Sequence, residues 1–179
     1  EIAIIQIDLT SPNRAERIAA FVNKAIPYPV VLVFSFSDTI AISISDKRIN
    51  QADKSKWVIE DTWMTAWFAP EAPNEAQQKF MQDMAMKNLS SLNFYAFYTD
   101  IKNRIIALNS ASRSGSYTVT SGDDTLNRAE ALKNLDRLEQ DKIELQNKLA
   151  KEKQMGRQVE MTNRIKKYAD QINGLKERL

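Results

Sequence analysis

The chain contains no Cys and no His, so any catalysis has to rely on Asp, Glu, Lys and a bound metal. That composition excludes disulfides, zinc sites built from Cys and His, and nucleophiles activated by His. The remaining enzymatic hypothesis is a metal-dependent nuclease, in which an Asp/Glu-x-Lys motif on a strand helps to hold Mg²⁺ and orient water. In the N-terminal two thirds only Asp100-Ile101-Lys102 has this spacing, and we expect it on a helix, where short matches arise by chance.

The other candidate acids do not form a recognisable metal-binding motif. We expect Asp8, Asp38, Glu60 and Asp61 to be solvated groups at the ends of strands. A glycine-rich phosphate loop is also absent, because the four glycines are widely separated. We therefore predict a non-enzymatic protein with no catalytic residues, no metal ligands and no cofactor, and keep a degenerate nuclease as the least favoured alternative.

Three tryptophans fall on odd-numbered positions of one strand-like segment. Trp57, Trp63 and Trp67 share this spacing with Ile59. Exposed aromatic residues in such a row could stack on nucleic-acid bases or contact a protein partner. An apolar strand face that lines the core explains the same pattern, and it is the favoured interpretation.

The last third of the chain, Asp123–Leu179, has no Pro and repeats apolar residues at spacings of three and four. This period is typical of long helices that bury one stripe against a partner helix. The stripe of the second half is formed by Met161, Ile165, Tyr168, Ile172, Leu175 and Leu179. The stripe of the first half is formed by Leu135, Leu138, Lys142, Leu145 and Leu149. We call these two stripes the seam and predict that they bind a partner.

The two halves of the seam do not share one heptad phase, and the phase changes between Lys151 and Val159. A single straight coiled coil keeps one phase throughout. We therefore predict a coiled-coil helical hairpin that turns near Gln154–Arg157, where Gly156 lies. A continuous helix with a stutter, paired with another chain, is the alternative.

Basic residues are concentrated where the phase changes. Between Lys148 and Lys167 there are seven basic residues and two acidic ones. Lys151, Lys153 and Arg157 are therefore candidates for sequence-independent contacts with nucleic-acid phosphates. A solvated flank of a coiled coil would have the same composition, and the net charge of the whole chain is only +2.

The first two thirds of the chain predict an α+β body. Strands are expected at 1–9, 30–36, 39–45 and 57–68, and helices at 13–25, 74–89 and 91–109. This order, β-α-β-β-β, predicts an antiparallel sheet with covering helices. The predicted domains are the body at 1–109, a Ser/Thr/Gly-rich flexible tether at 110–122 and the helical arm at 123–179.

Several short motifs together resemble a bacterial and archaeal family classed as a domain of unknown function. They are Lys24–Pro29 (KAIPYP), Trp57-Val58 followed by Trp63 and Trp67, Leu92-Asn93 with Tyr95, and Leu149–Met155 (LAKEKQM) with Arg157, Val159 and Glu160. The resemblance extends over essentially the whole chain. Family members often have an aromatic residue and Asn where this chain has Met155 and Gly156.

The resemblance implies a setting in the cell more than an activity. Members commonly carry a further N-terminal segment, and they are commonly encoded beside helicases and DNA methyltransferases in restriction-like or phage-defence loci. No catalytic residues are transferred by the resemblance. Together with the absence of an apolar run of about 20 residues, it leads us to expect a cytoplasmic accessory subunit whose partner is a helicase or methyltransferase subunit, or a second copy of the chain.

Overall fold

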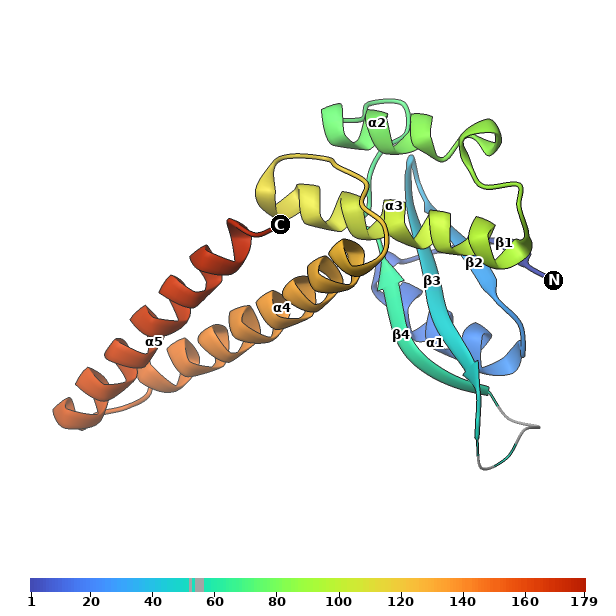
Figure 1. Ribbon diagram of the computed structural model, residues 1–179. Helices are drawn as coiled ribbons and strands as arrows, with labels where there is room; N and C mark the ends of the chain where they lie inside the picture. Colours follow the sequence, from blue (N-terminus) through green and yellow to red (C-terminus); the bar gives the residue numbers. More distant parts are fainter. Residues whose placement is uncertain (52, 54–56) are drawn as a thin grey trace. The chain divides into compact units, whose positions relative to one another are not determined.

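The structure, a computed structural model, describes residues 1–51, 53 and 57–179, which group into two compact units. Unit 1 contains residues 1–109 and 117–119, and unit 2 contains residues 110–116 and 120–179. Figure 1 shows the sheet and its helices in unit 1 and a pair of long helices in unit 2. Among the helices of the described residues, none is both long and apolar enough to cross a membrane.

Unit 1 is built on a four-stranded sheet. Its strands are β1 (Ala3–Asp8), β2 (Val30–Phe36), β3 (Thr39–Ile49) and β4 (Trp57–Met64), and they lie in the order β1-β2-β3-β4. The prediction of a fully antiparallel sheet is wrong, because β1 pairs with β2 in the parallel direction. The helix between them returns the chain to the end of the sheet where β1 began, which makes a β-α-β crossover.

The crossover helix α1 (Ala15–Ala25) covers one face of the sheet. It follows a single 3-10 turn, η1 (Pro12–Arg14), so the predicted helix at 13–25 exists but begins in a different geometry. The small side chains of Ala15 and Ala19 let α1 pack closely on the inward residues of β2, and all of these residues are buried. Ile26, in extended conformation before Pro27, ends the helix.

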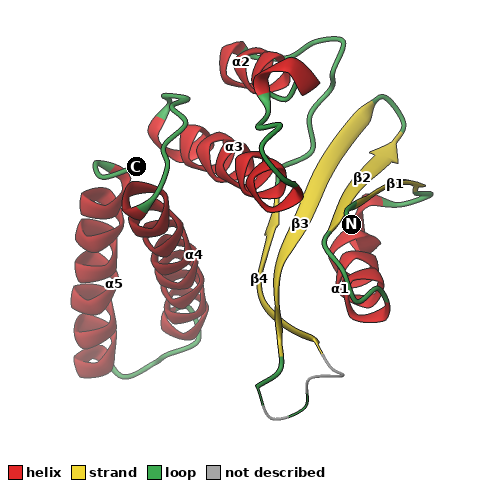
Figure 2. Cartoon of the chain, turned by 45° about the vertical axis from the view of Figure 1, so that its right-hand side comes forward, coloured by secondary structure: helices red, strands yellow, loops and turns green. Residues whose placement is uncertain are grey.

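The opposite face of the sheet carries α3 (Phe94–Ser114), and Figure 2 shows α1 and α3 on the two sides of the strands. Ile101 and Ile105 of α3 are buried, as is Ile44 on this face of β3. Before α3, the chain forms α2 (Glu75–Asp83), which begins with a capping box between Asn74 and Gln77, and the 3-10 turn η2 (Met86–Asn88). The helices predicted at 74–89 and 91–109 are therefore present with shifted ends.

The tryptophans of β4 do not form a common surface. Trp57 is exposed, Trp63 is buried, and Trp67 lies beyond the end of β4, where its ring meets Phe36 edge-on at 6.5 Å between centroids. The predicted strand at 57–68 ends at Met64, and Phe68 forms only an isolated bridge with Ile40. This arrangement gives no row of rings on which nucleic-acid bases could stack.

Unit 2 consists mainly of α4 (Asp123–Leu149) and α5 (Met155–Lys176), which pack against each other and are joined by a turn at 150–154. The chain is therefore broken into two helices, and the alternative of one continuous helix is wrong. The turn overlaps the predicted site only at Gln154, and Gly156 lies inside α5. Glu152 explains the position, since its carboxylate accepts hydrogen bonds from the backbone N–H groups of Lys153 and Gln154 at 2.9 Å. Whether the two helices form a true coiled coil stays a prediction.

The segment predicted as a tether contains the end of α3 and three residues that belong to unit 1. α3 continues to Ser114, so the first residues of the predicted tether at 110–122 are helical. Tyr117 then returns to unit 1, where its ring meets Phe80 edge-on at 6.5 Å, and Phe80 meets Phe68 in the same way at 6.1 Å. The chain therefore passes between the two units three times.

Candidate partner-binding surfaces

All seam residues are buried or half-buried in unit 2. Leu135, Leu145 and Ile172 are buried. The half-buried members are Leu138, Lys142, Leu149, Met161, Ile165, Tyr168, Leu175 and Leu179. Because α4 and α5 pack on each other and no seam residue of either helix is exposed, we infer that the two halves of the seam face each other. The seam is thus used within the chain, which limits its access to a partner.

An ion-pair network ties three helical segments of unit 2 together. Arg113, in the last turn of α3, pairs with Asp136 at 2.9 Å and with Glu139 at 2.7 Å, both on α4. Glu139 also pairs with Lys176 at the end of α5, at 3.3 Å. Glu139 is therefore the central residue that links all three segments. The network fixes the end of α5 that lies far from the turn.

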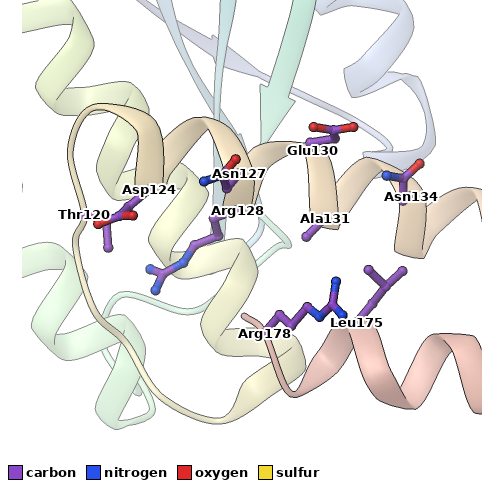
Figure 3. Close-up of a pocket in the computed structure, with 9 residues that line it drawn as sticks. All are labelled: Thr120, Asp124, Asn127, Arg128, Glu130, Ala131, Asn134, Leu175 and Arg178. Atoms are coloured by element: carbon purple, nitrogen blue, oxygen red, sulfur yellow. The ribbon is translucent and has the colours of Figure 1, made fainter.

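A groove lies between the first half of α4 and the last turns of α5. It consists of two adjoining hollows with volumes of about 580 and 420 Å³, which share Asn134, Leu175 and Arg178. Figure 3 shows the larger hollow, with Ala131 of α4 on one side and, on the other, Leu175 of α5 and Arg178 just beyond the end of that helix. We call these two hollows the α4–α5 groove. The groove gives a partner access to the edge of the seam at Leu138 and Leu175.

The charge of the groove changes along its length. The larger hollow contains Arg128 together with the carboxylates of Asp124 and Glu130. The smaller hollow contains Arg137 and Arg178 and no carboxylate. Neither of these two arginines forms a side-chain hydrogen bond or ion pair with another residue in the described part of the chain. The smaller hollow therefore combines an apolar floor with unpaired positive charge.

The turn between α4 and α5 gathers the three residues predicted to touch nucleic acid. Lys151, Lys153 and Arg157 are all exposed, as is Lys148 just before the turn. Glu152 is the one acid among them, and its pKa is lowered by the Gln154 backbone hydrogen bond, then by Lys153 and by the Arg157 charge. The Nη1 atom of Arg157 lies 3.8 Å from Oε2 of Glu152, which is a long distance for an ion pair. The turn thus presents a compact positive surface.

The candidate acids of the nuclease hypothesis are scattered over unit 1. Asp8 accepts a hydrogen bond from Ser35, Glu60 pairs with Arg48, and Asp100 accepts from the backbone N–H of Ser90 at 2.8 Å. The Ser35 hydrogen bond lowers the pKa of Asp8. Within residues 1–51, 53 and 57–179, no three acidic side chains come together as metal ligands would. The described residues therefore contain no cluster of acids that could serve as the metal centre of a nuclease. The nuclease hypothesis stays an untested prediction.

Unit 1 carries a separate exposed apolar patch beside the edge strand β1. A hollow of about 510 Å³ is lined by Ile4 of β1, Met86 of η2 and Phe94 and Phe97 of α3. Ile4, Met86 and Phe94 are all more than half exposed. Apolar patches of this kind are frequent at interaction sites. Nothing in the structure indicates what covers this one.

A comparison of the sequence with known protein families identifies the family to which the chain belongs. The sequence profile of a family described as "Domain of unknown function (DUF4391)" matches residues 1–172. The chain belongs to the DUF4391 family. No curated protein and no solved structure matches it.

In this DUF4391 chain, reasoning from the sequence found the seam and the basic turn but missed the groove. Arg137, Gly174 and Arg178 were not singled out, although all three line the smaller hollow. One signal was present in the sequence, since a glycine within a long helix costs stability and needs an explanation. The arginines carried no comparable signal, because basic residues are common on every solvated helix.

Proposed function

We propose that this DUF4391 chain is a non-enzymatic accessory subunit that docks onto a larger DNA-processing complex through α4 and α5. The observation that carries the proposal is unit 2 itself. Two long helices protect their seam against each other, yet they leave an apolar groove and exposed apolar side chains at Ile143 and Val159. Such surfaces are typical of protein-binding helices.

The larger complex is proposed from the resemblance described above. Genes of this family commonly lie beside helicases and DNA methyltransferases in restriction-like or phage-defence loci, so these enzymes are the proposed partners. A chain with a compact α+β unit and a separate helical unit suits an adaptor that holds one protein and binds another. Cytoplasmic location follows from the same proposal.

A co-purification experiment tests this function. The chain is tagged and expressed with its chromosomal neighbours, and the recovered proteins are identified by mass spectrometry and their stoichiometry by mass photometry. Recovery of a helicase or methyltransferase subunit in fixed ratio is the expected result. A chain that is recovered alone, with all neighbours expressed and folded, would refute the accessory-subunit proposal.

A second candidate function is nucleic-acid binding at the turn between α4 and α5. The specific observation is that Lys151, Lys153 and Arg157 are all exposed within one short segment. Each phosphate contact on duplex DNA contributes about 0.9 to the slope of log affinity against log salt concentration.

Replacing these three residues by Ala should reduce the magnitude of that slope by about 0.9 for each of the three lost contacts. Binding should weaken on every DNA sequence tested. The matched control replaces three exposed cations of unit 1, Arg17, Lys24 and Lys87, by Ala. Both variants lose the same charge, so equal effects would indicate nonspecific attraction and not a site at the turn.

A further inference from the structure

We propose that the α4–α5 groove binds an amphipathic helix of a partner protein, and that this helix carries acidic residues beside its apolar stripe. The inference rests on the proposed function, because it names the chemistry of the partner that unit 2 would recognise. The bound helix would complete a three-helix arrangement in which its apolar residues contact the edge of the seam at Leu138 and Leu175.

Gly174 provides the first argument for a closely packed occupant. It lies inside α5 and lines the smaller hollow. A glycine within a helix is about 1 kcal/mol less favourable than alanine. Nothing in the described part of the chain requires the small residue, since a Cβ atom at Gly174 would meet no atom within 4 Å apart from its chain neighbours and the backbone of α5. A helix that approaches the backbone of α5 at this position would explain why a side chain is absent.

The charges of the groove provide the second argument, because they determine the sign of the charge that the partner helix must carry. Arg137 lies on α4 and Arg178 just beyond the end of α5, both beside the apolar floor of the smaller hollow, and neither has an acidic partner in the described part of the chain. Arg164 lies two heptads before Arg178, so it continues the positive flank of α5 toward the turn. Acidic residues that flank the apolar stripe of a bound helix would pair with these arginines.

The same arginines argue against a second copy of the chain as the occupant. In a symmetric dimer whose two-fold axis passes through the smaller hollow, that hollow would meet the same hollow of the other copy. Arg137 and Arg178 would then face arginines of equal charge, and such a contact is unfavourable. The groove therefore favours a different protein as its occupant.

The first test measures binding of a defined probe to the full chain. The probe is a fluorescent synthetic helix of three heptads with Leu at the a and d positions and Glu at the flanking positions. A matched probe carries Lys in place of Glu. Fluorescence anisotropy should show tighter binding of the Glu probe, and Arg137→Glu combined with Arg178→Glu should reverse the preference. Equal affinity for the two probes, or an unchanged preference in the double variant, would overturn the proposal.

A pair of glycine variants tests whether the probe occupies the groove. Gly174→Trp fills the smaller hollow, whereas Gly156→Trp places the same side chain on α5 near the turn and outside the groove. A Cβ atom meets nothing within 4 Å at either position, so both variants should keep the helix content of the parent chain. We expect Gly174→Trp to raise the dissociation constant of the Glu probe at least about tenfold. An equal effect of the two variants would overturn the proposal.

The glycine variants also separate this inference from the proposed function. If a stoichiometric partner co-purifies equally with the parent chain and with Gly174→Trp, the groove proposal fails and the accessory-subunit proposal stands. If the partner is lost with Gly174→Trp and kept with Gly156→Trp, both are supported. If the probe binds in the groove but no neighbour co-purifies, the groove proposal stands and the accessory-subunit proposal fails.

Discussion

At the scale of single residues, Tyr98 shows how unit 1 holds two strands together with one buried hydroxyl group. Its oxygen accepts a hydrogen bond from the Ser45 N–H at 3.1 Å, and its proton is directed at the carbonyl oxygens of Ser45 and Val30, at 2.9 and 3.2 Å. Burial raises the pKa of Tyr98 to about 12. The hydroxyl lies beside the irregularity in β3 between Ser45 and Lys47, where the regular pairing with β4 is interrupted.

Replacing Tyr98 by Phe should lower the free energy of unfolding by about 1–3 kcal/mol, because the buried N–H of Ser45 loses its partner. Urea denaturation followed by circular dichroism measures the change. The control is Tyr95→Phe, which removes a hydroxyl group from an exposed ring of the same helix. Similar losses in the two variants would show that the hydroxyl of Tyr98 has no special structural role.

Lys47 should make the stability of unit 1 depend on pH. Its ammonium group donates hydrogen bonds to the carbonyl oxygens of Ile26 and Tyr28, both at 2.9 Å, and burial lowers its pKa from 10.5 to about 8. Between these two values the unfolded chain binds more protons at this residue than the folded chain does. Its contribution to the free energy of unfolding therefore increases as the pH rises from about 8 toward 10.5.

Lys47→Met removes the titrating group, so the stability of the parent chain relative to this variant should rise between pH 8 and pH 10 and stay constant below pH 8. Urea unfolding at a series of pH values measures the difference. Tyr98 titrates in the unfolded state near 10.0, so the comparison stops at that pH. A difference that does not change with pH would contradict the assignment of a lowered pKa to Lys47.

At the scale of elements, the hairpin-like pair α4 and α5 is fixed at both ends by different means. The turn end is held by Glu152, whose carboxylate accepts hydrogen bonds from the backbone N–H groups of Lys153 and Gln154, just before α5 begins. The other end is held by Glu139, which pairs with Arg113 and Lys176. Because these hydrogen bonds stabilise the turn, it needs no glycine, which is why Gly156 was a misleading signal for its position.

Glu139→Gln should weaken the attachment of α3 and α5 to α4, with a loss of about 0.5–1 kcal/mol because the carboxylate is partly exposed to solvent. The loss should shrink as salt is added, since salt screens such pairs. Thermal unfolding at low and high ionic strength measures it. Glu144→Gln is the matched control, because Glu144 is an exposed acid of α4. A salt-independent loss would indicate that the ion pairs are not its cause.

The elements also show how far the sequence predicts the fold. β2 was predicted with its observed ends, Val30–Phe36, because a buried apolar run bounded by Pro29 and a turn is unambiguous. α4 begins at Asp123, where the predicted helical arm begins, and acids such as Asp123 and Asp124 are favoured at a helix N-terminus. The direction of β1 was not predicted. It depends on whether the connection to β2 returns the chain to the end of the sheet where β1 began, and the residue pattern does not show this. The extension of α3 to Ser114 was also missed, since three of its last five residues are Ser, which has a weaker helix propensity than Ala or Leu.

Of the candidate site, the sequence predicts the seam but not the α4–α5 groove. A seam of apolar residues repeats along one helix, so it can be read from a single segment of sequence. The groove is made by residues far apart in the chain, such as Arg137 and Arg178, and exists only after α4 and α5 have packed. The contact of Tyr117 with Phe80 has the same character, because a single aromatic residue in a polar segment does not reveal its neighbour.

At the scale of the whole molecule, the two compact units should respond separately to damage in the seam. Ile172 is buried in unit 2, so Ile172→Glu places a charge where α4 and α5 pack, and burial of an unpaired charge is strongly unfavourable. We expect amide hydrogen exchange to accelerate throughout α4 and α5 while β2 and β3 keep their protection. The control Gln171→Glu introduces the same residue at the adjacent exposed position. Protected α4 and α5 amides in the Ile172 variant would show that the seam does not hold unit 2 together.

The three passages of the chain between the units have a consequence for its covalent integrity. Residues 110–116 belong to unit 2, and residues 117–119 belong to unit 1. If the backbone is cut after Gly115, the N-terminal fragment keeps Arg113, which pairs with α4 in the other fragment. The C-terminal fragment keeps Tyr117, whose ring packs on Phe80. Each fragment would therefore retain a piece of the other's unit, and the severed chain should behave as a split protein whose halves reassemble without a covalent bond.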